Sequence, residues 1–410
     1  IQDLRNRMPL VAGRRTWVRV YVESDNPPAF TWPEVDAAVQ LARGDQTLVI
    51  YPENGPITTK PAGPDRTVVG DTLNFLVPDD WTTAGEVTVR AVTWSYTPST
   101  VLEREPDADN NLRAVSVRFR EGKDPELVVV PLDPTPAPGD EPSDATMQAV
   151  PSWMSAGLLD FHPIADPVFW VFQQTLAPGP EAQVPGEWDL GVLRVPRRDE
   201  PLTRMAWLHA LWDLPPFMRL AGVVNASVPT AGYSGWSKGA LFSFWTVQSQ
   251  TTPPHELGHQ WGLGHAGCVD ADGDGVGDEA KGGALDPTYP NGLPKCSLAP
   301  TDPEGYYGFT TYQTPLQAYS NDPASPAAAF PMMSYKSPKW TDPYHYCTLL
   351  DAYGVEGARV VPYSMAGKDL PDLKLFKLVI CDESHNLRND ATKAHEAIRD
   401  YVRRNSSKVL

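Results

Sequence analysis

The segment His255–His265, HELGHQWGLGH, constrains this chain more than any other, because it holds three histidines at fixed spacings. On a helix, His255 and His259 lie four residues apart on one face, so both imidazoles can reach one metal ion. Gly262 has no Cβ and tolerates a positive φ, so we expect the helix to end there and the chain to turn His265 toward the same ion. Three neutral histidines leave one position open for water, as a catalytic Zn²⁺ requires.

Glu256 directly follows the first histidine of this segment. A carboxylate in that place can take a proton from water held at the metal, so we assign Glu256 as the candidate general base. A bare H-E-x-x-H pentapeptide arises by chance in about one chain in a hundred of this length. The further match at Gly262 and His265 makes chance a poor explanation of the full pattern.

The five positions His255, Glu256, His259, Gly262 and His265 resemble the signature of the metzincin zinc endopeptidases. The resemblance implies a bound Zn²⁺, hydrolysis of peptide bonds in a protein or peptide substrate, and a helix that carries the signature. It also implies a methionine turn further along the chain, beneath the metal.

Residues 330–335, FPMMSY, are similar to that methionine turn. We choose Met333 over Met332, because only Met333 puts Tyr335 where astacin-like and serralysin-like relatives keep a tyrosine near the metal. Tyr335 is then a candidate donor to the oxyanion of the reaction. Without the histidine motif, the better interpretation would be that this segment only contributes a methionine to the hydrophobic core.

An acidic, glycine-rich loop follows the third histidine. Its carboxylates belong to Asp270, Asp272, Asp274 and Asp278. Carboxylates at alternate positions, with glycines for a sharp turn, favour Ca²⁺. Lys281 stands where an EF-hand has its bidentate glutamate, and the loop resembles thrombospondin type 3 or dockerin repeats more closely. A calcium site and a solvated acidic loop are therefore both open readings.

Four cysteines are present, and Cys268 and Cys296 bracket this irregular loop. We expect a disulfide between them that restrains the loop. Two free thiols are the alternative, since Cys347 and Cys381 indicate that unpaired cysteines are tolerated. A disulfide would place the protein outside the reducing cytosol, so we predict a secreted, extracellular protein.

The amino-acid composition argues against some classes of binding partner. The formal charge of −17 argues against nucleic acid and anionic membranes, and no run of 18 apolar residues is present to span a membrane. With 410 residues the chain can form two or more domains, and 43 prolines favour loops and edge strands over long helices. None of these quantities sets the oligomeric state.

We predict an α+β chain that begins with a β-sandwich at residues 1–122. Apolar or alternating segments at 16–22, 46–51, 73–77, 86–94 and 112–119 are separated by turns rich in Pro, Gly, Asn and Asp. Residues 109–119 resemble the last strands of Ig-like accessory modules of secreted bacterial proteins.

Residues 123–365 are predicted to form a metzincin-like zincin domain with a mixed sheet and the active-site helix. Its expected elements are strands at 127–130 and 239–247 and helices at 144–159, 201–214 and 344–350. Thr252 is the expected N-cap of the signature helix, with Pro253 in its first turn. The resemblance implies that the strand before this helix is an exposed edge along the cleft, to which a peptide can add.

Residues 366–410 differ from the rest, with nine Lys or Arg, seven Asp or Glu and one of the 43 prolines. Residues 375–389 resemble the DExH segment of Swi2/Snf2-like helicases. The chain has no G-x-x-x-x-G-K-[ST] loop to hold phosphates, which argues against an ATPase. We interpret the tail as a fragment of unclear origin: a fusion, a frame or assembly artefact, or an incomplete C-terminal domain.

The sequence therefore predicts a secreted zinc-dependent endopeptidase. The alternative is an extracellular binding or adhesion module, in which the β-sandwich recognises a glycan or a protein and the zinc site is secondary or silent.

Overall fold

The structure is a computed structural model of the chain. It describes residues 8–23, 33–95, 111–132, 142–172, 188–189, 194–195, 202, 205–206, 208–210, 213–215, 218–225, 235–238, 242–246, 250–270, 285–287, 289–290, 296, 298, 306–355, 378–379 and 408–409. The chain divides into two compact units, one of Ile1–Asp286 with Asn291–Glu356 and one of Pro287–Pro290 with Gly357–Leu410. The described elements are mostly strands with few helices, so the predicted mixed α+β class is confirmed.

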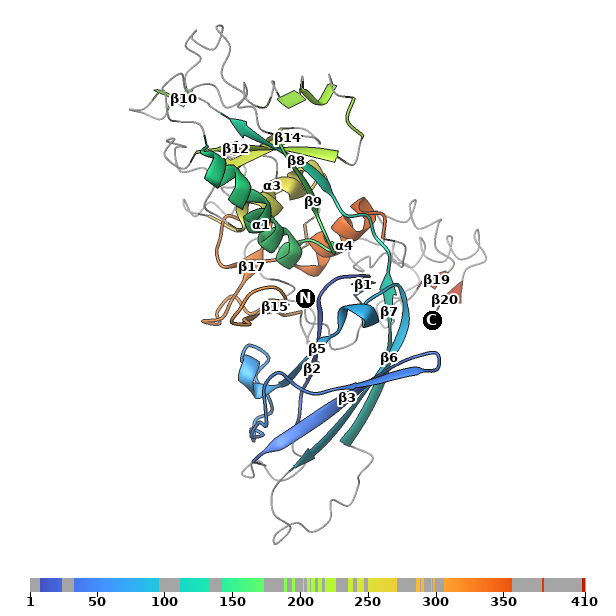
Figure 1. Ribbon diagram of the computed structural model, residues 1–410. Coiled ribbons are helices and arrows are strands. Elements are labelled where there is room, and N and C mark those ends of the chain that lie inside the picture. The colour runs from blue at the N-terminus through green and yellow to red at the C-terminus, as the bar shows by residue number, and fades with distance from the viewer. Residues whose placement is uncertain are drawn as a thin grey trace. The chain divides into compact units, whose positions relative to one another are not determined.

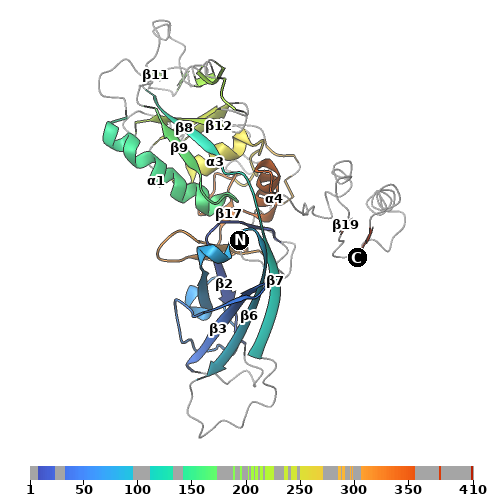
Figure 2. The ribbon, with the colours of Figure 1, turned by 45° about the vertical axis from the view of Figure 1, so that its right-hand side comes forward.

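Two sheets lie in the N-terminal part of the first unit. The larger has the order β1-β7-β6-β3-β4, and β2 pairs antiparallel with β5 in the smaller. The strands are β1 (Leu10–Val11), β2 (Thr16–Val20), β3 (Val35–Arg43), β4 (Gln46–Ile50), β5 (Leu73–Val77), β6 (Gly85–Ser95) and β7 (Leu112–Arg120), with short 3₁₀ helices η1 (Val69–Asp71) and η2 (Asp79–Trp81). Figure 2 shows β3, β6 and β7 running side by side. One apolar cluster includes side chains from both sheets.

Strand β3 is the main element of this region that the sequence did not predict. Its residues Val35, Ala37, Val39 and Leu41 are buried, and the residues between them are partly exposed. This is the period of two that a half-buried strand requires. Alanines at 37 and 38 weaken the contrast between the two faces, which is why the pattern was not recognised.

A second five-stranded sheet lies in the C-terminal part of the same unit, in the order β13-β14-β12-β8-β9. Its strands are β8 (Glu126–Leu132), β9 (Val168–Val171), β12 (Met218–Val224), β13 (Gly235–Lys238) and β14 (Phe242–Thr246). All neighbours are parallel except β13, which is antiparallel to β14. Residues 127–132 and 219–224 are buried throughout, as expected for central strands covered on both faces.

The position of β13 corrects one expectation. The strand directly before the signature helix, β14, lies inside the sheet between β12 and β13. The edge is formed by β13, which precedes β14 in the chain and folds back on it as an antiparallel partner. The sequence pattern identified the last strand but could not give its place in the sheet, because pairing order is not a local property.

Three helices complete the described core: α1 (Asp144–Phe161), α3 (Thr252–Gln260) and α4 (Pro343–Ala352). Helix α1 lies beside α3 and also contacts β9, while α3 contacts β13 and β14 (Figure 1). Ser143 caps α1 by accepting a hydrogen bond from Thr146 N at 3.2 Å. The buried side chains of α1 recur at steps of three or four, at Met147, Val150, Met154, Leu158 and Phe161.

Arg14 from the N-terminal part of the unit closes the other end of α1. Its guanidinium donates to the carbonyl oxygens of Leu159 (2.6 Å), Asp160 (3.4 Å) and His162. The last carbonyls of a helix have no partner within the helix, and a cation there also complements the helix dipole. The side chain of Asp160 in turn accepts from Gln313 Nε2 at 2.6 Å. The C-terminus of α1 is therefore held from two directions.

Short strand pairs make up the remaining elements: β10 (Trp188–Asp189) with β11 (Arg194–Val195), β15 (Gly308–Phe309) with β16 (Ala318–Tyr319), β17 (Phe330–Pro331) with β18 (Lys339–Trp340), and, in the second unit, β19 (Leu378–Val379) with β20 (Lys408–Val409). The rest of the helicase-like segment, including Asp382 and Glu383, lies outside the described residues. None of the described helices has the length and apolar character that crossing a membrane requires.

We predict that Gly157→Ala destabilises the fold. A Cβ added at Gly157 on α1 would overlap the carbonyl oxygen of Gln250, just before α3. Forcing the two segments apart should lower the free energy of unfolding by about 1–3 kcal/mol, as overpacking typically does. Denaturant unfolding measures the loss. Gly70→Ala is the control, since a Cβ there meets nothing within 4 Å, and equal stability of the two variants would contradict this account of packing.

Candidate metal centre

Pro253 and Pro254 are the second and third residues of helix α3 (Thr252–Gln260), in the first turn, where their missing N–H groups cost nothing. The N-cap is Thr251, one residue before the predicted Thr252, and its side chain makes no capping hydrogen bond. The helix is therefore not fixed at its start by a local cap.

The end of α3 turns on Gly262, which has a φ of 86°. Its N–H donates to His259 O at 2.9 Å, and Leu263 N donates to Gly258 O at 3.0 Å. This pair of bonds is a Schellman motif, in which the left-handed residue is nearly always glycine. The chain reverses here and carries His265 back toward the helix.

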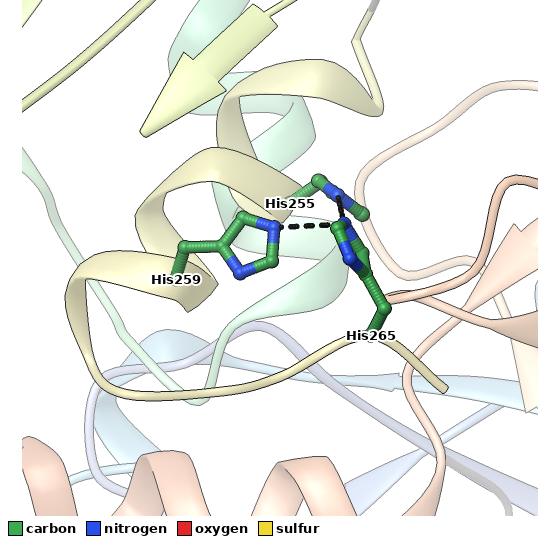
Figure 3. Close-up of side chains that lie close together, drawn as sticks. All are labelled: His255, His259 and His265. Atoms are coloured by element: carbon green, nitrogen blue, oxygen red, sulfur yellow. Dashed lines mark hydrogen bonds between the residues drawn. The ribbon is translucent and has the colours of Figure 1, made fainter. Parts of the chain in front are cut away.

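The three histidine side chains meet at one point (Figure 3). His265 Nε2 lies 3.3 Å from His255 Nε2 and 3.1 Å from His259 Nε2. One ligand atom from each ring lies within 4.8 Å of the others. Nitrogens about 3.3 Å apart are what a tetrahedral ion with Zn–N bonds of about 2.0–2.1 Å requires.

Two backbone carbonyls set the tautomers of the helical histidines. His255 Nδ1 lies 2.9 Å from Met332 O, and His259 Nδ1 lies 2.8 Å from Leu263 O. A carbonyl only accepts, so each Nδ1 carries the proton and each Nε2 presents a lone pair. An imidazole nitrogen has one in-plane site, so His265 Nε2 can share a proton with one neighbour at most. A cation at the meeting point satisfies all three nitrogens.

The protonation states agree with this assignment. Burial, followed by the positive charge of Lys339, holds the pKa of His255 well below its usual value. Burial also lowers the pKa of His259. Both rings are therefore neutral at neutral pH, which is the form that binds a metal. The donor set, spacing and tautomers fit a metal ion and are compatible with Zn²⁺.

The loop that carries His265 is tied on both sides. Asp286 N donates to His265 O at 2.9 Å, and Ala266 N donates to Met333 O at 3.0 Å. Three residues beyond His265, the predicted disulfide between Cys268 and Cys296 is present, with Cα atoms 5.4 Å apart. Closing a loop of 28 residues stabilises the fold by about 3–4 kcal/mol in the chain-entropy model. Of the four predicted calcium ligands, only Asp270 is among the described residues.

The methionine segment lies directly beneath α3. Met332 and Met333 are buried, and a Cβ added at Gly258 would lie 2.7 Å from Met333 Sδ and 3.3 Å from Met332 Cε. The helix can approach the methionines this closely because residue 258 is glycine. Tyr335 is 44% exposed, and its ring centroid lies 4.9 Å from that of His265 and 5.9 Å from that of His255.

Glu256, the residue directly after His255, is buried. Burial raises the pKa of its carboxyl to about 8, and Lys339 opposes this shift. A Cβ added at Gly235 on β13 would lie 2.7 Å from Glu256 Oε1. The carboxyl group therefore borders the edge strand, and only a residue without a side chain leaves room for it. Ser237 Oγ on the same strand donates to Glu256 O at 3.1 Å.

Several supporting residues were not found from the sequence. Met332 and Leu263 act through backbone carbonyls, which leave no trace in residue type. His162, after α1, lies 2.8 Å through Nε2 from Pro254 O at the start of α3. The buried position of this histidine depends on a contact between residues 92 positions apart, so no local pattern could indicate it.

The described residues thus form a mixed α+β fold with a three-histidine cluster that can hold a metal ion. The sequence matches no protein-family model and none of the curated proteins.

We predict that His265→Ala weakens metal binding by at least about 100-fold, because one of three ligands is lost and loss of a supporting residue alone costs 10–100-fold. Competition with a chromophoric chelator measures the dissociation constant. His209→Ala is the matched control, since His209 is not part of the cluster. Unchanged metal affinity in His265→Ala would contradict a three-histidine site.

We predict an acid-sensitive contribution of His162 to stability. Burial lowers the pKa of this ring from 6.5 to about 4. Between these pH values the unfolded state binds the proton and the folded state does not. The contribution is therefore complete above pH 6.5 and is lost as the pH falls toward 4, by about 3 kcal/mol.

The variant His162→Gln keeps a donor and an acceptor but does not titrate in this range. Its free energy of unfolding should fall less than that of the wild type between pH 6.5 and 4, as measured by urea unfolding. Parallel pH curves for the two proteins would refute the assignment.

Proposed function

We propose that this protein is a secreted zinc-dependent endopeptidase of the metzincin type, with an Ig-like accessory domain before a zincin-like catalytic domain. The observation that carries the proposal is the convergence of the ring nitrogens of His255, His259 and His265, together with a glutamate that directly follows His255, is buried and borders strand β13. The mixed sheet, with parallel strands and one antiparallel edge strand beside the signature helix, supports the same class.

In this proposal His255, His259 and His265 hold Zn²⁺. When bound, the ion supplies a Lewis acid that lowers the pKa of water and polarises the scissile carbonyl. The positive charge of a bound Zn²⁺ would lower the pKa of the Glu256 carboxyl, which burial raises to about 8, and so favour the carboxylate form. In that form Glu256 accepts a proton from the attacking water at a carboxylate oxygen and delivers it to the leaving amine. The Tyr335 hydroxyl, on an exposed ring beside His265, donates to the developing oxyanion.

The edge strand β13 is suited to bind a peptide substrate. Within the described part of the chain, β13 is an outermost strand of its sheet, which is the position at which an extended peptide can add to a sheet. Gly235 of β13 borders the Glu256 carboxyl. A peptide bound along this edge would pass next to the general base.

Location and further cofactors follow from the same features. The disulfide between Cys268 and Cys296 supports an oxidising, extracellular environment. We retain Ca²⁺ in the proposal as a structural ion bound by the loop from Asp270 to Asp278. The charge of −17 remains an argument against nucleic acid as a partner.

We predict that Glu256→Gln retains the metal and loses peptidase activity by about 10²–10⁴-fold, because the amide cannot take the proton of water. Cleavage of a denatured protein substrate, followed by mass spectrometry, measures activity, and metal content is measured on the same sample. A strong zinc chelator should abolish wild-type cleavage. Wild-type activity in Glu256→Gln would exclude the base role, whereas metal-loaded wild-type protein without chelator-sensitive cleavage would favour a binding module.

A further inference from the structure

One chain of hydrogen bonds connects the two ends of α3 through the hydroxyl of Tyr353. Trp261 Nε1, just after the helix, donates to Tyr353 OH at 3.0 Å. Tyr353 OH lies 2.7 Å from His162 Nδ1, and His162 Nε2 lies 2.8 Å from Pro254 O in the first turn. Residues from three separate parts of the sequence therefore meet around one helix.

The chemistry of the end groups fixes the direction of every bond in this chain. An indole N–H only donates and a carbonyl oxygen only accepts. His162 Nε2 must then carry a proton for Pro254 O, and its neutral Nδ1 accepts the hydroxyl proton of Tyr353. The tyrosine oxygen accepts from Trp261 and donates to His162, so each group in the chain is used in its proper sense.

Burial and ring contacts keep this chain of hydrogen bonds rigid. Tyr353 is 2% exposed and His162 is fully buried, so water does not compete for these bonds and each is strengthened by low local polarity. The Tyr353 ring also meets the rings of Trp261 and His162 edge-on, with centroids 5.1 Å and 5.9 Å away. Arg219 stacks over the Trp261 ring at 4.0 Å.

Helix α3 needs external support of this kind. It has nine residues and no side-chain cap at Thr251, and helices this short are marginal by themselves. Two of the metal ligands, His255 and His259, lie between the two tethered ends. Metal–ligand distances tolerate errors of only about 0.2 Å, so small shifts of the helix change the affinity for metal.

We propose that Tyr353 is a positioning residue for the metal site: its hydroxyl, through His162 and Trp261, holds both ends of α3 so that His255 and His259 are placed for metal binding. The inference rests on the proposed function only for the choice of zinc. It assigns no chemical step to Tyr353, which acts through the helix alone.

The test compares Tyr353→Phe with Tyr346→Phe in the full chain. Tyr346 is a buried tyrosine on the neighbouring α4, and its hydroxyl donates to Pro9 O at 3.3 Å, outside the chain that holds α3. Each variant loses one buried hydroxyl. The measurements are Zn²⁺ and Co²⁺ dissociation constants by chelator competition, the visible spectrum of the Co²⁺ form, and the thermal midpoint of the chelator-treated protein.

We expect Tyr353→Phe to weaken both metals by at least about tenfold and to change the Co²⁺ spectrum, while Tyr346→Phe stays within about twofold of the wild type. Trp261→Phe, which breaks the same chain from its partly exposed end, should reproduce the loss and add little to Tyr353→Phe in the double variant. It also serves as the second variant if Tyr353→Phe does not fold.

Two results overturn the inference. Equal metal affinity in Tyr353→Phe and Tyr346→Phe, with lowered thermal midpoints, would make the role of Tyr353 purely structural. Additive losses in the Tyr353 and Trp261 variants would mean that the two residues act separately. Because the readout is metal affinity, a wild-type protein without peptidase activity would refute the proposed function and leave this inference standing.

Discussion

The structure depends on one constraint: His265 Nε2 is held 3.3 Å from His255 Nε2 and 3.1 Å from His259 Nε2, and the latter two nitrogens present lone pairs. Such an arrangement repels itself unless a cation or a shared proton occupies its centre. The Schellman turn at Gly262, the tie from Ala266 to Met333 and the disulfide at Cys268 all oppose the spreading of these rings. The local fold therefore favours a positive charge at the centre of the three histidine rings.

The backbone supplies much of this preorganisation. Met332 O and Leu263 O orient the two helical histidines, and neither contact depends on the side chain of its residue. Orientation by carbonyls is rigid, because the carbonyls belong to turns that are themselves hydrogen-bonded. A substitution at residue 332 or 263 would consequently affect the metal through packing of the turn rather than through loss of a functional group.

The histidine motif could be predicted from the sequence because its geometry is almost entirely local. The spacing of His255 and His259 on a helix and the glycine turn before His265 require no knowledge of distant segments. The disulfide was predictable for a similar reason, since both cysteines flank one loop. The strand Leu73–Val77, a short and mainly apolar segment between turns, was located to the residue.

Features that depend on contacts between distant segments could not be predicted. The inner position of β14, the tie from His162 to Pro254 and the close approach of Gly235 to Glu256 arise only when strands and helices far apart in sequence pack together. Strand β3 was missed for a different reason, because its alanines hide the buried face.

The closure of α1 by Arg14 has a consequence for how this protein can be dissected. Arg14, which donates to the last carbonyl oxygens of α1, belongs to the N-terminal sheet region. His162, which directly follows α1, contacts Pro254 O at the start of α3. Excising the first 122 residues would leave those carbonyls facing solvent and would loosen a support of the metal-bearing helix. The N-terminal region is thus not an interchangeable attachment, and a shortened protein that begins after it would lack part of the support of the metal-bearing helix.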